Sequence, residues 1–229
     1  MLDELAWLGL EAKYIDAARS FYEDDLDLSV ASATGAAVRF EVGPSTLVIR
    51  RPTGVPRGGL HTHFACSIPA DEYEAWWDRL EPAFDLEEVQ FGDAKSLYCY
   101  DPDGNCVELG QRDVDGPGID GLFEVALEVA SLERSEAFYE RLGFETVDTG
   151  ADRRRVRMAG PIALELWEPQ LGIADARGGV HVDLGFFCDD PASVVELVRD
   201  DACETTARGP DRVVVDPDGH VLTVTESAG

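Results

Sequence analysis

The sequence predicts an α+β fold made of four copies of one small unit, arranged as two tandem domains. The segment Leu8–Tyr22 recurs in outline as Val125–Tyr139, 117 residues later. A glycine pair followed by an apolar residue and a histidine occurs at 58–61 and again at 178–181, and the turn Asp-Pro-Asp-Gly occurs at 101–104 and 216–219. Self-similarity at a nearly fixed interval indicates a duplicated architecture. We therefore expect domains at 1–112 and 121–229, with the Gly- and Pro-containing segment 113–120 as the linker.

Each half divides again at its glycine pair, and each quarter has the pattern of a strand, a helix and three strands (βαβββ). In the first unit we expect a strand at 5–10, a helix at 15–24, and short β-rich runs at 40–42 and 46–50. In the second, the strand 61–67 precedes a helix whose apolar residues Tyr73, Trp76, Trp77 and Leu80 recur at helical spacing. Strands at 96–100 and 106–110 close this unit around the turn at 101–105.

The second half repeats this order. The third unit is expected to contain a strand at 122–129, a helix at 132–142 that ends at Gly143, and strands at 145–148, 153–158 and 162–167. The fourth is expected to contain a strand at 180–187, a helix at 192–199, and strands at 213–215 and 221–226 joined by the second Asp-Pro-Asp-Gly turn.

Composition excludes several classes of protein. The chain has 46 acidic and 19 basic residues, so nucleic acid would be repelled. It has no apolar run long enough to span a membrane and no signal peptide at its start, so we expect a cytoplasmic protein without a membrane partner. The five cysteines lack CxxC spacing, which disfavours a disulfide framework or a cysteine zinc site.

The motifs resemble those of the glyoxalase, bleomycin-resistance and extradiol dioxygenase superfamily, also called the vicinal oxygen chelate superfamily. The resemblance is strongest in the helix at 133–144 and in the closing hairpin at 101–109. It implies curved mixed sheets that form open cups, with metal ligands on the first and last strand of each unit. The matching positions in this sequence are Trp7 and Val48, His61 and Glu108, Glu124 and Glu165, and His181 and Thr223.

These eight positions are unequal in their ability to bind a metal. The second and third units supply His61, Glu108, Glu124 and Glu165, which suit a divalent ion such as Zn, Ni, Mn or Fe. If the inner units pair with each other, as they do in single-chain glyoxalase I enzymes, the chain has one intact metal cup and one that has lost its ligands. His63 lies on the same strand face as His61. In an acidic chain, the three glutamates could equally be the solvent-facing residues of alternating strands.

If neighbouring units pair instead, as in extradiol dioxygenases, the iron positions become Glu124, His181 and Thr223. Two histidines and a carboxylate are the usual iron ligands, so this triad would be broken. A weaker site of Glu124, Glu165 and His181 stays open under this pairing.

The resemblance implies a divalent-metal-dependent glyoxalase-like enzyme, a lyase or isomerase that moves a proton next to the carbonyl of a small carbonyl or thiol-adduct substrate. Glu108 is the first candidate for the catalytic base and Glu165 the second. An extradiol-type ring-cleaving dioxygenase and a non-catalytic binding protein of the bleomycin-resistance kind are the alternatives. Four units in one chain can form both cups without a partner, so we expect a monomer or a homodimer.

The acidic surface predicts that salt stabilises the fold, because excess carboxylates with only two lysines resemble the composition of proteins from salt-loving organisms. We expect the melting temperature to rise between about 0.1 M and about 2 M KCl as the salt screens self-repulsion. Sucrose at matched osmolality is the control for a general excluded-solute effect. A melting temperature that does not depend on KCl would contradict this expectation.

Overall fold

The computed structural model describes residues 1–52, 61–151, 155–169 and 182–227, apart from the side chains of 61, 62 and 182. It contains the four expected units. The first unit comprises β1 (Leu5–Glu11), α1 (Ile15–Ser20), a π-helical turn η1 (Phe21–Asp25), β2 (Val30–Ala33), β3 (Ala37–Val42) and β4 (Ser45–Arg50). The second comprises β5 (His61–Pro69), the 3-10 turn η2 (Ala70–Glu72), α2 (Tyr73–Leu80), β6 (Glu87–Phe91), β7 (Ala94–Tyr100) and β8 (Cys106–Arg112).

The third and fourth units follow the same order. The third comprises β9 (Gly121–Glu128), α3 (Leu132–Arg141), β10 (Glu145–Thr149), β11 (Arg155–Ala159) and β12 (Ala163–Trp167). The fourth comprises β13 (Val182–Cys188), α4 (Pro191–Val198), β14 (Glu204–Arg208), β15 (Asp211–Val215) and β16 (Val221–Glu226). The segment expected as a linker, 113–120, lies between β8 and β9.

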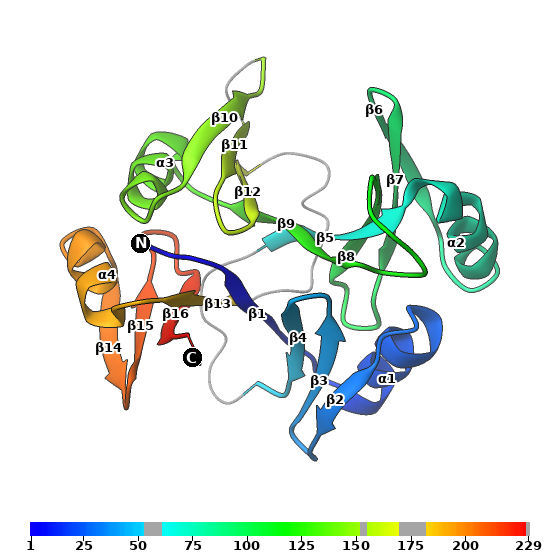
Figure 1. Cartoon of the computed structure of the whole chain (residues 1–229), viewed down its shortest axis with the longest axis horizontal. Helices are drawn as coiled ribbons and strands as arrows, with labels where there is room; N and C mark the ends of the chain where they lie inside the picture. Colours follow the sequence, from blue (N-terminus) through cyan, green and yellow to red (C-terminus); the bar gives the residue numbers. More distant parts are fainter. Residues whose placement is uncertain (53–60, 152–154, 170–181, 228–229) are drawn as a thin grey trace.

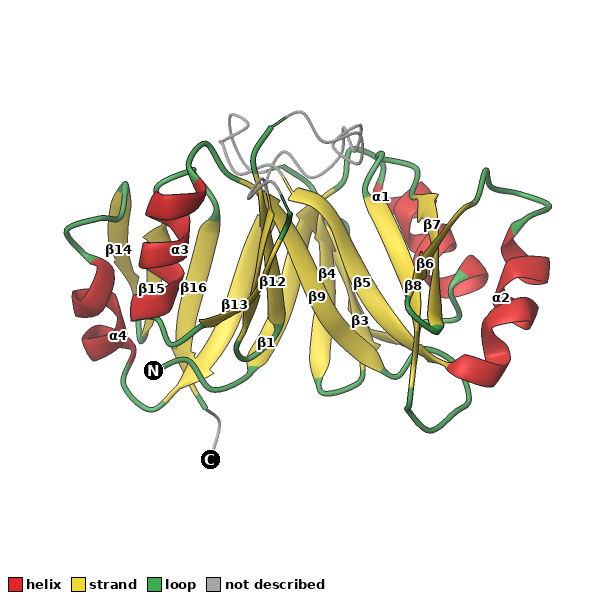
Figure 2. Cartoon of the chain, turned by 90° about the horizontal axis from the view of Figure 1, so that it is seen from above, coloured by secondary structure: helices red, strands yellow, loops and turns green. Residues whose placement is uncertain are grey.

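The units pair inner with inner and outer with outer. The described strands form two eight-stranded sheets, and each sheet takes one unit from each half of the chain. The inner sheet has the order β10-β11-β12-β9-β5-β8-β7-β6, and the outer sheet has the order β14-β15-β16-β13-β1-β4-β3-β2. Both sheets are curved, and the four helices flank them at the two ends of the molecule (Figure 1; Figure 2). This is the pairing under which the sequence predicted a single intact metal cup.

The central strand pairs are antiparallel, whereas the first and last strands of each unit are parallel. In the inner sheet β5 runs antiparallel to β9, and in the outer sheet β1 runs antiparallel to β13. Within the inner units, β5 is parallel to β8 and β9 is parallel to β12. The first and last strands of two units therefore occupy the middle of the inner sheet, which places their side chains across one surface.

The repeated motifs at the helix and the turn bind each other and join the two sheets. Tyr22 of η1 donates a hydrogen bond from its hydroxyl to Oδ2 of Asp101, at 2.8 Å, in the turn after β7. Tyr139 of α3 donates the equivalent bond to Oδ2 of Asp216, at 2.9 Å. All four side chains are buried. The strongest repeat in the sequence is thus a structural contact between an outer unit and an inner unit.

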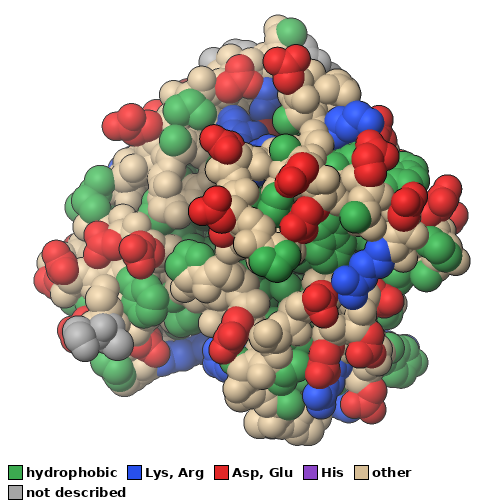
Figure 3. Space-filling view, turned by 45° about the vertical axis from the view of Figure 1, so that its right-hand side comes forward, with side chains coloured by type: hydrophobic (Ala, Val, Ile, Leu, Met, Phe, Trp, Pro, Cys, Tyr) green, Lys and Arg blue, Asp and Glu red, His purple; other side chains and the backbone are tan. Residues whose placement is uncertain are grey.

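Three strands that the sequence patterns did not locate are β2, β6 and β14, and each lies at the edge of a sheet or near its end. Their residues are mostly exposed, so their apolar and polar residues do not alternate as they do in half-buried strands. On the face shown in Figure 3, acidic side chains are widely spread, with fewer lysine and arginine side chains among them. Among the described residues, no helix is long and apolar enough to cross a membrane.

The tyrosine contacts predict matched losses of stability. We expect Tyr22→Phe and Tyr139→Phe each to lower the free energy of unfolding by about 1–3 kcal/mol, because each removes a hydrogen-bond donor from a buried aspartate oxygen. Tyr14→Phe is the control, since the Tyr14 side chain is 60% exposed. Urea denaturation in salt measures all three. A loss in the control as large as in the other two variants would contradict the assignment.

Candidate metal centre

Three buried side chains converge on the concave side of the inner sheet. They are His63 of β5, Glu108 of β8 and Glu124 of β9, and one ligand atom from each lies within 4.8 Å of the others. His63 Nε2 is 3.3 Å from Glu108 Oε2 and 3.5 Å from Glu124 Oε1. One imidazole and two carboxylates are suitable donors for a divalent ion. The donor set therefore fits the metal that the sequence resemblance implies.

Strand register explains why these three side chains meet. Ala65 on β5 pairs with Glu108 on one side and with Glu124 on the other. His63 lies two residues before Ala65, and side chains two residues apart on a strand project from the same face. Residues that pair directly across strands also share a face, so the imidazole and both carboxylates project from one surface, with the small Ala65 side chain between the two carboxylates.

Alternation along the strands would have allowed the three carboxylates to face solvent. In the structure they are buried instead. Glu108 is 3% exposed, Glu124 is 4% exposed and Glu165 is 6% exposed. Burying an ionised carboxylate is costly unless it is paired and hydrogen-bonded. Three buried carboxylates on one face of the sheet therefore distinguish this site from the acidic residues of the exposed surface.

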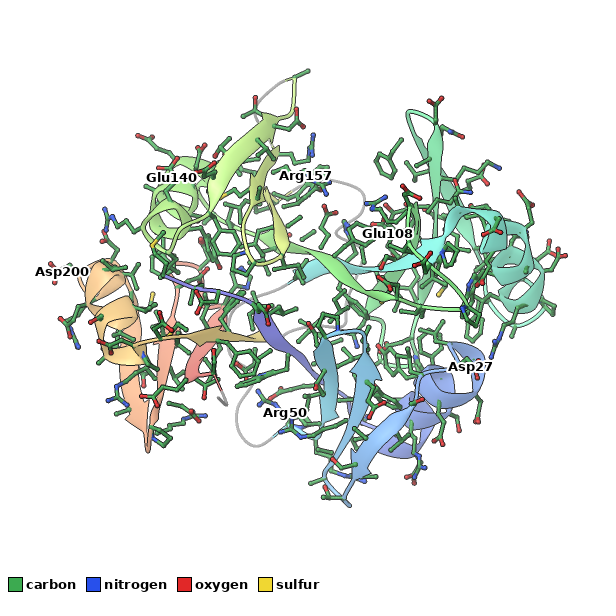
Figure 4. All side chains as sticks on the ribbon, viewed as in Figure 1. Asp27, Arg50, Glu108, Glu140, Arg157 and Asp200 are labelled. Atoms are coloured by element: carbon green, nitrogen blue, oxygen red, sulfur yellow. The ribbon has the colours of Figure 1, made fainter. Side chains whose placement is uncertain are left out.

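Each ligand carboxylate directs one oxygen to His63 and the other to an outer partner. Glu108 Oε1 accepts a hydrogen bond from Ser96 Oγ at 2.6 Å. Glu124 Oε2 lies 2.6 Å from Arg157 Nη1. Such outer contacts fix the orientation of ligand side chains in metal sites. Figure 4 labels Glu108 and Arg157 on the two arms of the inner sheet.

Glu165, the fourth predicted ligand, lies beside this cluster. Its Oε1 accepts from Arg155 Nη1 at 2.5 Å and its Oε2 accepts from Trp167 Nε1 at 2.9 Å. Arg157 Nη1 also lies 3.4 Å from Glu165 Oε1. Both oxygens of Glu165 thus accept hydrogen bonds from the protein itself. The positive charges of Arg155 and Arg157 partly compensate the Glu165 carboxylate.

The structure brings His63 to the position where the sequence predicted His61. The side chain of His61 lies outside the described residues, so its assignment as a ligand stays a prediction. The strand pairing decides between the two histidines. The pairing of β5 with β9 matches His63 with Ala126 and Ala65 with Glu124, so His63 is the counterpart of Glu124.

The pKa values show a strong electrostatic interaction within the cluster. Burial by itself would lower the pKa of His63, but hydrogen bonds to Glu108 and Glu124 and their charges outweigh it and raise the pKa to about 9. Burial opposes ionisation of Glu108 as well, yet His63, Ser96 and Tyr98 together lower its pKa. Burial and the charge of Glu165 raise the pKa of Glu124. Without a metal, the imidazolium is the positive charge between the two carboxylates, and Arg157 adds a second one on the outer side of Glu124.

A pocket of about 510 Å³ opens above the cluster. Its volume is within the range of small-molecule sites. Its lining combines the carboxylates with arginines and with apolar or aromatic side chains, namely Val89, Phe91, Tyr98, Arg112, Arg155, Arg157 and Trp167. A small molecule with oxygen atoms at one end and an apolar body fits this distribution.

The outer sheet has no comparable site among its described residues. At its centre Asp183 accepts a hydrogen bond from Thr223 Oγ1 at 2.9 Å and lies 3.4 Å from both Trp7 Nε1 and Arg50 Nη1. A Cβ added at Gly185 would lie 2.1 Å from the Trp7 ring, so the indole occupies this cup. His181 lies outside the described residues.

The iron positions of the alternative pairing are not brought together. Glu124 lies in the inner sheet and Thr223 in the outer sheet, where it pairs with Gly185. Pairing of neighbouring units was therefore the wrong alternative for this chain, because the antiparallel pairing of β5 with β9 joins the inner units.

Solved structures share this architecture over nearly the whole chain. Glyoxalase I from Zea mays has a TM-score of 0.70 at 19% identity, covering 97% of this chain and 92% of that one. The fold is that of glyoxalase I. A candidate dioxygenase from Bacillus subtilis subsp. subtilis str. 168 has a TM-score of 0.74 at 15% identity, covering 100% of this chain and 86% of that one. The expected vicinal oxygen chelate fold is confirmed, and at these identities the likeness shows the glyoxalase I fold alone.

Sequence comparison adds no further relative. No protein-family model matches the chain, and no curated protein matches it. The chemistry of this glyoxalase I fold must therefore be inferred from its own side chains.

The raised pKa of His63 predicts how the stability of the metal-free protein depends on pH. The stabilisation from protonated His63 is fully present below pH 6.5, its ordinary pKa, and is lost as the pH rises through about 9. We expect the free energy of unfolding, measured with a chelator present, to fall over this window in the parent and to fall less in His63→Gln. Parallel curves for the two proteins would contradict the ion-pair assignment.

Proposed function

We propose that the chain is a divalent-metal-dependent enzyme of the glyoxalase I type, acting as a lyase or isomerase on a small carbonyl or thiol-adduct substrate. The observation that carries this proposal is the buried cluster of His63, Glu108 and Glu124 at the base of the pocket. An open pocket lined by three buried residues able to bind a metal has little structural purpose, since it removes apolar contacts from the core.

His63, Glu108 and Glu124 would hold the ion. A bound divalent ion supplies Lewis acidity to a substrate carbonyl oxygen. The surrounding side chains position the substrate. Tyr98 and Trp167 form apolar walls, and burial of the carboxylates excludes bulk water from the reacting end of the pocket.

Glu165 is the residue that we propose as the proton carrier, with Glu108 kept as a ligand. Glu108 contacts His63 and Ser96, one with each oxygen, and belongs to the three-residue cluster, so its carboxylate would be engaged in holding the ion. The donors to Glu165 lie outside that cluster, and Trp167 leaves Oε2 of Glu165 a second lone pair that can take a proton. Glu165 lines the same pocket outside the cluster, where its carboxylate can accept a proton from the carbon beside a carbonyl and return it to the neighbouring carbon. Arg155 and Trp167 fix its position during both transfers. This reverses the order of the two candidate bases inferred from the sequence.

The proposal predicts that metal binding and catalysis depend on different glutamates. We expect the parent to bind one divalent ion per chain, and Glu108→Gln to weaken that binding by about 10- to 100-fold. Glu165→Gln should retain metal within about threefold but lose about 100-fold or more in kcat with a hemithioacetal substrate. Elemental analysis, metal titration and steady-state kinetics measure these effects, with the exposed strand residue Glu41→Gln as the control.

Other outcomes would support the other members of the superfamily. Oxygen uptake with catechols by the iron-loaded protein would favour a dioxygenase, although the cluster offers one histidine where such iron sites use two. Absence of metal in both the parent and Glu108→Gln would contradict the enzyme proposal and favour a binding protein.

A further inference from the structure

The two inner units are related by an approximate two-fold arrangement, so each side chain at the site has a counterpart. The register matches His63 with Glu124, since each pairs with an alanine on the opposite strand. It matches Glu108 with Glu165, since these pair with Ala65 and Ala126 in the same way. On the neighbouring strands, Tyr98 pairs with Glu108 and Arg157 pairs with Glu165. Tyr98 is therefore the counterpart of Arg157.

The two candidate ligands, His63 and Glu124, differ in charge, and their neighbours Tyr98 and Arg157 differ in the compensating direction. In the second unit the ligand is an imidazole, and Tyr98 stands edge-on to it with the ring centroids 5.7 Å apart. In the third unit the ligand is the carboxylate of Glu124, and the guanidinium of Arg157 lies 2.6 Å from its outer oxygen. An imidazole is neutral when it holds a metal ion, so with metal bound the neutral ligand has a neutral neighbour and the acidic ligand has a cationic neighbour. In that state both members of the second pair carry a charge that the first pair lacks.

We propose that Arg157 is the counter-ion of Glu124, which lies nearer to it (2.6 Å) than Glu165 does (3.4 Å), so that Glu124 and Arg157 together present the metal centre with the net charge of a histidine. This inference rests on the proposed function. Glu124 Oε1 faces His63 and the cluster, whereas Oε2 faces Arg157, so one carboxylate can serve both partners at once. Arg157 is thereby a positioning and charge-setting residue of the metal centre.

The charge balance gives the physical reason. The two carboxylates of Glu108 and Glu124, with that of Glu165 beside them, would bind a divalent ion strongly but reduce its ability to polarise a carbonyl oxygen. A guanidinium on the far side of Glu124 repels the ion and withdraws electron density from the carboxylate. Arg157 therefore lowers metal affinity and maintains Lewis acidity, which is the opposite of what a purely structural contact would do.

Four variants test this with Zn²⁺ and Co²⁺ titrations against a chromophoric chelator. Arg157→Gln, which removes the charge, should bind both ions about tenfold or more tightly, whereas Arg157→Lys should stay within about threefold of the parent. Glu124→His removes the nearer of the two carboxylates that face the guanidinium and should weaken binding about tenfold or more. The double variant Glu124→His, Arg157→Tyr, which copies the pair of the second unit, should return to within about threefold of the parent.

The control is Arg39→Gln, an exposed arginine on the outer sheet, which should bind metal like the parent. Melting of each metal-free variant in salt checks folding, and Arg157→Met replaces Arg157→Gln if that variant does not fold. Arg157→Gln binding metal equally or more weakly than the parent, or Arg157→Lys behaving like Arg157→Gln, would overturn the counter-ion assignment alone. A parent that binds neither ion would overturn the proposed function, and the counter-ion assignment with it.

Discussion

The antiparallel pairing of β5 with β9 is the constraint on which the candidate site depends. These strands belong to different halves of the chain, and their pairing brings the second and third units into one sheet. A shift of one residue would turn the ligand side chains to the opposite face, because side chains alternate along a strand. The burial of Phe64 and Val125 on that opposite face therefore fixes the register and, with it, the position of His63 beside Glu124.

The general architecture could be predicted because it depends on local patterns and on their repetition. The helix with Tyr22 or Tyr139 and the Asp-Pro-Asp-Gly turn bind each other in both halves, so selection for the fold leaves the same residues at the same interval. Edge strands such as β6 escaped prediction because almost none of their residues is buried. The expected helix at 15–24 was correct in position, but its second half is the π-helical turn η1.

The site could be predicted only in part, because the relevant information lies in register and burial. Glu108, Glu124 and Glu165 were identified, yet nothing local distinguishes them from solvent-facing acids in a chain with 46 acidic residues. The choice between His61 and His63 needs the strand pairing, since both share one face by spacing. The separation of Glu165 from the cluster depends on the contacts of Arg155, from the neighbouring strand, and of Trp167, two residues along the same strand, and the sequence pattern does not show which groups these side chains bind.

The two cups differ in how the corresponding space is used. Among the described residues, the inner cup gathers three candidate metal ligands and the outer cup does not. In the outer cup Arg50 faces Asp183, and Trp7 occupies the space over Gly185, so the charge is paired and the volume is filled. In the inner cup Arg157 faces Glu124, but the pocket above the carboxylates is left open. Since an arginine compensates a buried acid in both cups, ion pairing alone does not distinguish the two. The open volume beside three converging ligand atoms does, because stability by itself would favour filling that volume with side chains, as the outer cup has done.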